Sequence, residues 1–487
     1  MLFNSVEFAI FLPVVFFLYW FIFQNNLRLQ NFLIVLASYV FYGWWDWRFL
    51  SLIVFSTIVD YSIGIFLSKE GRSLQRSLLL YSSVVVNLGF LGFFKYYNFF
   101  AESFTEAFSF FGRPIDPFTL NIVLPVGISF YTFQTLSYTI DVYRRNLEPT
   151  RDIIAFTAFV SFFPQLVAGP IERATNLLPQ FYKKRSFEYD KAVDGMRQIL
   201  WGLFKKIVIA DNCAVYANDI FNNYEDYNGS TLLLGAVFFA FQIYGDFSGY
   251  SDIAIGTSRL FGFDLMRNFA FPYFSRDIAE FWRRWHISLS TWFRDYLYIP
   301  LGGSKGPMQK KVRNIFIIFI VSGFWHGANW TFIIWGALNA LYFLPLLLLG
   351  KNRSYTDTVA QNRVLPSLKE LFQMGLTFGL TIIAWVFFRA ESVGIALSYL
   401  NAIFSKSLLK SPFPDLALIN MGQSVVNLFE VLILFLLVEW LQRSEQHALG
   451  FSTLKLQPVF KWIIYYTVIV LCFVMNGSQQ DFIYFQF

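Results

Sequence analysis

The sequence has few cysteines, few histidines and little charge. Of its 487 residues, two are cysteine, three are histidine and 14% are charged. Cys213 and Cys472 stand alone in apolar text, so the chain offers neither a disulfide framework nor paired thiolates for a metal. The formal net charge is only +6. Nucleic acid needs a dense basic surface, so we expect no nucleic-acid partner.

Apolar surface, in contrast, is abundant. Hydrophobic residues make up 56% and aromatic residues 21% of the chain, and the mean hydropathy is +0.48. One soluble core does not bury that much apolar surface, whereas a bilayer solvates the outside of a helix bundle. The composition therefore predicts an integral membrane protein.

Apolar stretches of bilayer-crossing length recur along the chain. They predict an all-α polytopic bundle with about ten to twelve transmembrane helices, plus re-entrant and interfacial helices. Pro125 and Gly127 interrupt one stretch, and Pro164 and Pro170 interrupt another. Broken backbone at membrane depth persists only where protein buries it or a wet cavity solvates it. No solenoid-length repeat or low-complexity linker divides the chain, so we expect one membrane domain over residues 1–487.

Most of the charge excess lies in residues 276–313. This stretch holds eight Lys or Arg against three Asp or Glu, a net charge of +5. The positive-inside rule places it on the cytoplasmic face. Its first part has a helical period and predicts an amphipathic helix in the interface or under the bundle. The polar stripe is Asp277, Glu280, Arg284, Ser288, Thr291 and Asp295, and the apolar stripe is Ile278, Trp282, Trp285, Leu289, Trp292 and Tyr296.

Two of the three histidines occupy unusual positions. His286 lies at the edge of the apolar stripe, where a plain interfacial anchor needs no histidine. His326 stands in SGFWHGANW between two apolar runs. An ionisable group in such a place faces a bundle interior or an aqueous path rather than lipid. Gly323 and Gly327 flank it at a spacing that lets a second helix approach closely.

Two interpretations of His326 are open. In the first, it is an interhelical hydrogen-bonding residue on a packing face. In the second, its imidazole is a general base that takes a proton from a hydroxyl or thiol and promotes acyl transfer without a metal. Metal binding is the weaker alternative, because neither His286 nor His326 belongs to an H-x-x-H, H-E-x-x-H or C-x-x-C pattern. We expect no metal and no nucleophilic-serine elbow, so serine chemistry would come from a partner.

Acidic residues in two further apolar stretches also have two interpretations. Glu172 and Arg173 follow a Pro/Gly break, where a buried ion pair or turn formation explains them. Asp246 and Asp252 admit the same explanation. They fit a polar lining better, because the segment around them, FQIYGDFSGYSDIAIG, is too apolar for an ordinary loop.

Several stretches together resemble the membrane-bound O-acyltransferase family, in its bacterial polysaccharide-acetylating branch. The resemblance extends along the whole chain and is more specific than any single motif. The stretches are LPVGISFYTFQTLSYTIDVYR (124–144), FFPQLVAGPIER (162–173), GLFKKIVIADN (202–212), FQIYGDFSGYSDIAIG (241–256), NFAFPYFSRDIAEFWRRWHISLSTWFRDYLYIPLGG (268–303), GFWHGANWTFIIWG (323–336) and FIYFQF (482–487).

This resemblance implies a bundle with a central funnel, in the bacterial cytoplasmic (inner) membrane. It implies that His326 of the W-H-G motif is catalytic and that His286 of the R-W-H motif belongs to the same site. The donor would be a cytoplasmic thioester, with acetyl-CoA expected and no bound cofactor. The acceptor would be an extracytoplasmic polysaccharide such as alginate, and the partner a periplasmic or extracellular serine-hydrolase-like acetyltransferase. Along the path of donor and substrate we expect Trp285, Arg284, Asp246, Asp252, Trp325 and Asn329.

Three other functions compete with this one. A sister branch of the family transfers D-alanine from a carrier protein to teichoic acid, but YIPLGG and WHGANWT resemble the polysaccharide branch more. A transporter or flippase would use the polar residues as a permeation path, although the sequence lacks matched halves. A scaffold that only recruits a soluble acetylase would not require a histidine at membrane depth.

Overall fold

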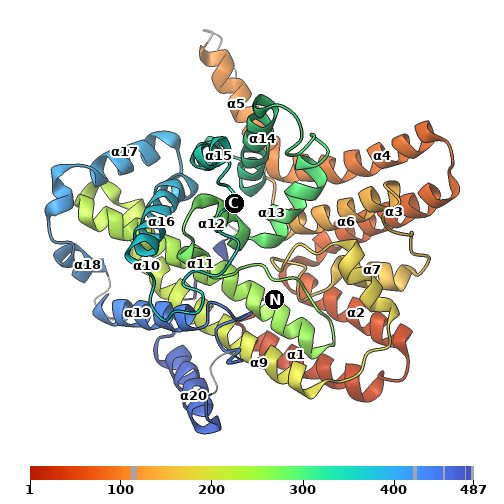
Figure 1. Cartoon of the computed structure of the whole chain (residues 1–487). Helices are drawn as coiled ribbons and strands as arrows, with labels where there is room; N and C mark the ends of the chain where they lie inside the picture. The colour runs from red at the N-terminus through yellow and green to blue at the C-terminus, as the bar shows by residue number, and fades with distance from the viewer. Residues whose placement is uncertain (111–117, 420–424, 453–455, 478, 484–487) are drawn as a thin grey trace. The chain divides into compact units, whose positions relative to one another are not determined.

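Every regular element in the described residues of the computed structural model is a helix, which confirms the all-α prediction (Figure 1). The residues form two compact units. The first is Met1–Gly195 with Thr257–Met266, and the second is Met196–Gly256 with Arg267–Phe487. The single membrane domain over the whole chain stays a prediction. The described residues are 1–110, 118–419, 425–452, 456–477 and 479–483.

The first unit contains the N-terminal helices, and two long helices have residues in both units. The helices of the first unit are α1 (Val6–Phe17), α2 (Leu27–Asp46), α3 (Leu50–Lys69), α4 (Ser73–Leu91), α5 (Tyr97–Phe110), α6 (Ile128–Tyr143), α7 (Ile153–Ser161) and α8 (Ala174–Leu177). The two with residues in both units are α9 (Tyr189–Phe204) and α11 (Gly229–Leu260).

The second unit contains the stretches with His286 and His326. Its helices are α10 (Asp211–Asn222), α12 (Ile278–Arg284), α13 (Ile287–Phe293), α14 (Met308–His326), α15 (Trp330–Leu348), α16 (Leu368–Arg389), α17 (Val393–Ile403), α18 (Phe413–Ile419), α19 (Val425–Leu441) and α20 (Pro458–Val474). Short π-helical turns, η5 (Lys205–Ala210) and η8 (Arg294–Tyr298), continue α9 and α13.

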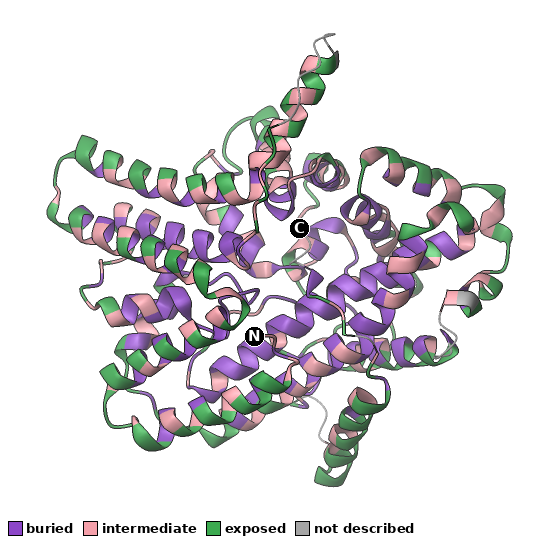
Figure 2. Cartoon of the chain, turned by 180° about the vertical axis from the view of Figure 1, so that it is seen from behind, coloured by how far each residue is buried: buried purple, intermediate pink, exposed green. Residues whose placement is uncertain are grey.

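Several helices are long and apolar enough to cross a bilayer. Figure 2 shows helices with a green, exposed stripe along one side and purple, buried residues along the other. Large apolar side chains on such exposed stripes have lipid as their natural solvent. Five helical segments of the described residues qualify by length and composition, and the number of ten to twelve crossings stays a prediction. The five are Leu27–Lys69, Ser73–Ser109, Gly229–Leu260, Trp330–Leu348 and Leu368–Arg389.

Both predicted chain breaks are present in the first unit. α7 ends at Ser161, and residues 162–173 are non-helical and buried throughout, as broken backbone in a membrane protein must be. The other break precedes α6, where Gly127 has a φ of 75°. A side chain at Gly127 would also overlap the carbonyl oxygen of Leu166. Glycine is therefore required there both for the left-handed backbone and for the close approach.

The single amphipathic helix predicted from the stripes of residues 277–296 is wrong. α12 ends before Trp285, His286 has a φ of 44°, and α13 begins at the next residue. Residues 268–270 form hydrogen bonds with the backbone groups at the break. The Ile287 N–H donates to the carbonyl oxygen of Asn268 at 2.9 Å, and the Ala270 N–H donates to the carbonyl oxygen of Arg284 at 2.9 Å. These tertiary hydrogen bonds outweigh the helical period of the sequence.

α14 and α15 pack side by side, close enough that backbone meets backbone (Figure 1). A Cβ on Gly323 would overlap the carbonyl oxygen of Phe332, and a Cβ on Gly336 would overlap that of Phe319. A Cβ on Gly327 would overlap the Phe332 ring. The close approach predicted from the glycine spacing is confirmed, and it fixes the position of His326 at the end of α14.

Gly323→Ala is expected to destabilise the protein by about 1–3 kcal/mol, because the new methyl group meets a carbonyl oxygen that only a helix shift can move. Thermal melting in detergent measures the effect. Gly379→Ala is the matched control, since nothing lies within 4 Å of a Cβ built there on α16. The control is expected to melt at or above the wild-type temperature, because alanine is the better helix former. Equal melting of the two variants would contradict this packing.

Candidate active site

His286 lies at the break between α12 and α13, where it is buried with 1% exposure. Its Nδ1 is 3.1 Å from the side-chain oxygen of Asn268. The ring of Phe247 packs edge-on against it with ring centroids 4.6 Å apart. Burial lowers the pKa of His286 to about 3. The imidazole is therefore neutral at physiological pH, which is the form that acts as a base.

His326 is the last residue of α14 and is 3% exposed. Aromatic rings from two other helices enclose it. The centroid of its ring is 5.2 Å from that of Trp335 on α15 and 5.3 Å from that of Phe388 on α16. The helix end and the tight packing of α14 on α15 place this imidazole inside the second unit, away from the outer surface.

The two histidine rings lie 6.4 Å apart, centroid to centroid. Trp325 joins them, because its ring centroid is 6.0 Å from His286 and 4.9 Å from His326. The fold therefore brings together in one site two imidazoles that are 40 residues apart in the sequence. Two imidazoles enclosed by aromatic side chains have the chemistry to take and return a proton during acyl transfer. The catalytic roles of both residues remain a proposal.

Trp285 and Trp325, both expected along the donor path, belong to the aromatic cluster around the histidines. The centroid of the Trp285 ring is 5.1 Å from that of Trp385, which stacks on Trp335 at 5.9 Å. Asn329, also expected there, caps α15 by accepting from the Thr331 N–H at 3.0 Å. Its amide nitrogen donates to the Glu391 carbonyl oxygen at 2.9 Å. These contacts give Asn329 a structural role.

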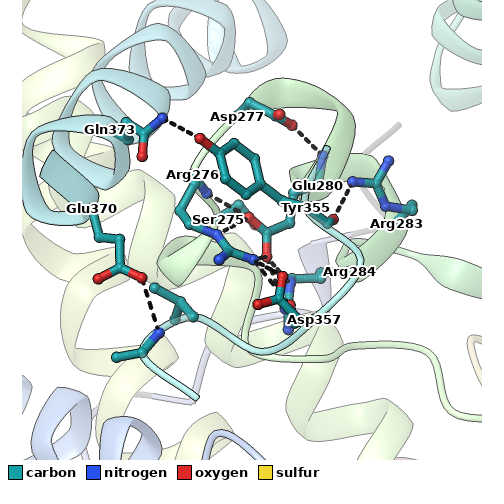
Figure 3. A network of polar contacts seen from close by, with 12 residues as sticks. Ser275, Arg276, Asp277, Glu280, Arg283, Arg284, Tyr355, Asp357, Glu370 and Gln373 are labelled. Atoms are coloured by element: carbon teal, nitrogen blue, oxygen red, sulfur yellow. Dashed lines mark hydrogen bonds and ion pairs between the residues drawn. The ribbon is translucent and has the colours of Figure 1, made fainter. Parts of the chain in front are cut away.

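Arg284, the charged residue expected on the donor path, is part of an ion-pair network (Figure 3). Its guanidinium pairs with Glu280 at 2.8 Å and donates to the carbonyl oxygen of Asp357 at 2.9 Å. Arg276 pairs with the same Glu280 at 3.0 Å and with the Asp357 carboxylate at 2.9 Å. Part of the basic stretch thus holds the loop before α16 against α12.

Asp246 and Asp252 on α11 form buried ion pairs, the interpretation that competed with a polar lining. Asp246 pairs with Lys206 at 2.9 Å, and Asp252 pairs with Lys205 at 2.5 Å. Lys206 also pairs with Asp211 at 2.9 Å. The ion-pair interpretation is therefore confirmed for both aspartates. The lysines were not predicted as partners, although two adjacent lysines in the apolar text GLFKKIVIADN were a visible signal.

A C-terminal segment completes this charge cluster. The Ile483 N–H donates to Asp246 at 2.6 Å, and the Lys206 ammonium donates to the Gln480 carbonyl oxygen at 3.0 Å. Phe482 is 2% exposed, with its ring 4.9 Å from that of Tyr250. The tail end of the described chain is therefore an integral part of the second unit.

Glu172 belongs to the first unit and hydrogen-bonds within it. Its carboxylate accepts from the Asn176 side chain at 2.7 Å and from the Met266 N–H at 2.5 Å. These bonds fit the interpretation that Glu172 and Arg173 shape the turn after the Pro/Gly break.

One expectation from the sequence was wrong. The residues Gly302-Gly303-Ser304-Lys305-Gly306 do match G-x-S-x-G, contrary to the expectation that no such elbow is present. The structure places them in a turn between η8 and α14, with Ser304 exposed and with φ values of 100°, 57° and 96° at the three glycines. A nucleophile elbow joins a strand to a helix. Ser304 lacks that context, and the pattern is explained as a glycine-rich turn.

Residues 43–386 match the model of the MBOAT, membrane-bound O-acyltransferase family. The chain belongs to this family. As predicted, it is an O-acyltransferase and a multi-pass membrane protein, and it uses an acyl donor. Both histidines, and the residues of the aromatic cluster except Phe388, lie within the matched residues.

Relatives of this membrane-bound O-acyltransferase come from several bacteria. The probable alginate O-acetylase of Pseudomonas aeruginosa is 45% identical over 83% of this chain and 75% of its own length. The peptidoglycan O-acetyltransferase of Helicobacter pylori is 31% identical over 100% of this chain and 98% of its own length. The teichoic acid D-alanyltransferase of Bacillus subtilis is 28% identical over 45% of this chain and 58% of its own length.

Proposed function

We propose that this chain takes an acetyl group from a cytoplasmic thioester and passes it across the membrane for O-acetylation of a polysaccharide. The observation that carries the proposal is the pair of buried imidazoles, 6.4 Å apart in an aromatic cluster. The donor is acetyl-CoA, whose thioester supplies an activated acetyl group without a bound cofactor. The family membership supports the bond-making step over a transporter or a scaffold.

His326 acts as the general base in this mechanism. Its imidazole takes the proton of the acceptor hydroxyl, which the partner enzyme supplies, and the hydroxyl oxygen attacks the thioester carbonyl carbon. The carbon–sulfur bond breaks, the ester forms, and the proton returns from the imidazolium to the leaving thiolate. His286 orients the reacting groups within the same enclosure. Aromatic walls exclude water, which would otherwise compete as the acceptor.

Exposed lysines of the basic stretch support a phosphate-bearing donor. Lys305 and Lys310 are exposed near the start of α14. Their charges would raise the local concentration of a polyanionic donor such as acetyl-CoA on the cytoplasmic side. On the opposite side, a serine-hydrolase-like acetyltransferase would receive the acetyl group and complete its transfer to the glycan.

Alginate is the acceptor that we propose first, because the Pseudomonas aeruginosa relative named for alginate has the higher identity, 45%. Peptidoglycan is the second candidate. The Helicobacter pylori relative named for it aligns over 100% of this chain, including the terminal residues. A free hydroxyl on either glycan can accept the acetyl group from the partner enzyme.

Inside-out membrane vesicles that carry the protein and enclose the partner enzyme with alginate oligomers are expected to cleave acetyl-labelled CoA faster than matched vesicles without the protein do. The label is expected on the oligomers, and enclosed peptidoglycan fragments test the second acceptor. Intact acetyl-CoA accumulating in the lumen would establish a transporter instead. Cleavage no faster than in the matched vesicles would show that acetyl-CoA is not the donor.

A further inference from the structure

Asn268 holds the chain break at His286 through both its backbone and its side chain. It is fully buried, with 0% exposure. Its carbonyl oxygen accepts from the Ile287 N–H at 2.9 Å, and its side-chain oxygen accepts from the Ser288 N–H at 3.3 Å. Both donors belong to the first turn of α13, where a helix lacks acceptors of its own. Asn268 therefore caps α13 from a distant part of the chain.

The same side chain determines which nitrogen of His286 carries the proton. A backbone N–H is always a donor, so the Asn268 atom that faces the Ser288 N–H must be the amide oxygen. That oxygen only accepts, and His286 Nδ1 lies 3.1 Å from it. The proton is therefore on Nδ1 and the lone pair is on Nε2. The Asn268 amide nitrogen agrees with this orientation, since it donates to Ser251 Oγ on α11 at 3.0 Å.

We propose that Asn268 is a positioning residue for acyl transfer, which fixes His286 as the Nδ1–H tautomer with its lone pair on Nε2. The proposal rests on the proposed function, because it gives His286 a role in the reaction. A wrong tautomer presents an N–H where the reaction needs a lone pair, even when the ring stays in place. Asn268 contacts no reacting group and acts through His286.

Charged residues around His286 are engaged elsewhere, so Asn268 is in a position to control its basicity. Arg267 donates to the Phe269 carbonyl oxygen, and Arg284 pairs with Glu280. On α11, Asp246 and Asp252 pair with lysines, as described above. His326 of α14 is the titratable group whose ring faces that of His286.

Asn268→Asp separates positioning from capping. The carboxylate keeps an acceptor for the Ser288 N–H, and its charge stabilises the imidazolium form of His286. The acidic limb of the kcat/KM profile for acetyl-CoA cleavage is therefore expected to move to higher pH by at least one pH unit. Asn31→Asp is the matched control, because Asn31 is 2% exposed and accepts from Arg185 at 2.7 Å in the first unit. Its profile is expected to stay in place.

Asn268→Ala is the second variant, in which His286 loses the Asn268 acceptor and the Ser288 hydroxyl, 3.5 Å from Nδ1, remains. We expect kcat to fall about 10- to 100-fold with KM little changed, and thermal melting to verify folding. A folded Asn268→Asp with an unmoved acidic limb, or a folded Asn268→Ala with kcat within twofold of wild type, would overturn the proposal. His286→Gln is measured first. If it retains full activity, the proposed role of His286 fails, which is a separate result from either Asn268 outcome.

Discussion

A His326→Gln variant is expected to fold normally and to lose acetyl-CoA cleavage by about 100- to 10,000-fold in kcat, the range for removal of a general base. Glutamine keeps a polar side chain of similar reach, but it has no basic nitrogen. KM for acetyl-CoA is expected to change little, because the ring sits between Trp335 and Phe388 and not among the exposed lysines. Steady-state cleavage by purified protein in detergent, with the partner enzyme and alginate oligomers present, measures both quantities.

His447 provides the control for this experiment. It is also buried, with 3% exposure, and lies beyond α19. His447→Gln changes a buried imidazole in the same way and is expected to retain cleavage within about twofold, because no part of the proposed mechanism uses it. Full cleavage by folded His326→Gln protein would remove His326 from the mechanism.

Lys206→Met is expected to lower the free energy of unfolding by about 3–5 kcal/mol, the cost of removing one partner from a buried ion pair. Lys206 is the shared cation of Asp211 and Asp246, each 2.9 Å from its ammonium. Without it, two carboxylates are buried next to each other. Burial already raises the pKa of Asp211 to about 7, so protonation is the remaining way to neutralise the cluster.

The destabilisation by Lys206→Met is expected to depend on pH. A carboxyl whose pKa is raised in the folded state binds more protons folded than unfolded, so stability falls as pH rises from about 4 towards and through the folded value. The variant should therefore melt closer to wild type at pH 5 than at pH 8. Lys191→Met is the control, because its pair with Asp264 has side chains 24% and 64% exposed. Exposed pairs contribute about 0–1 kcal/mol. Equal losses of stability in Lys206→Met and Lys191→Met would contradict the stabilising role of the buried charge cluster.

The sequence predicted features whose causes are local. Gly323 and Gly327 predict a close helix approach because the absence of a side chain acts directly at the contact. Pro164 and Pro170 predict a chain break because proline lacks the N–H that a helix needs. The family resemblance indicated that His286 and His326 share a site. The distance of 6.4 Å between their ring centroids is known only from the structure.

The features that the sequence did not predict depend on partners distant in the chain. The stripes of residues 277–296 follow a helical period, yet the bonds to Asn268 and Ala270 break the helix at His286. The periodicity of the sequence gives no information on these hydrogen bonds, because their partners lie outside the periodic segment. Likewise, nothing local to Asp246 shows that its partner is Lys206, 40 residues earlier on another helix. Asn268 itself carried no signal, because a single asparagine in RNFAF has no distinctive spacing.

The bond from the Ile483 N–H to Asp246 has a consequence for biosynthesis. The two residues are 237 positions apart. A ribosome that adds about 5–20 residues per second therefore needs about 12 to 47 s to make the segment between them. During that time α11 has already been synthesised, but Asp246 lacks the Ile483 N–H that donates to it in the folded protein. Chains released early by a premature stop codon would keep Asp246 and Lys206 but lack Ile483. In such chains the charge cluster would lack one of its hydrogen bonds, and the membrane's quality-control proteases would have incompletely folded chains as substrates.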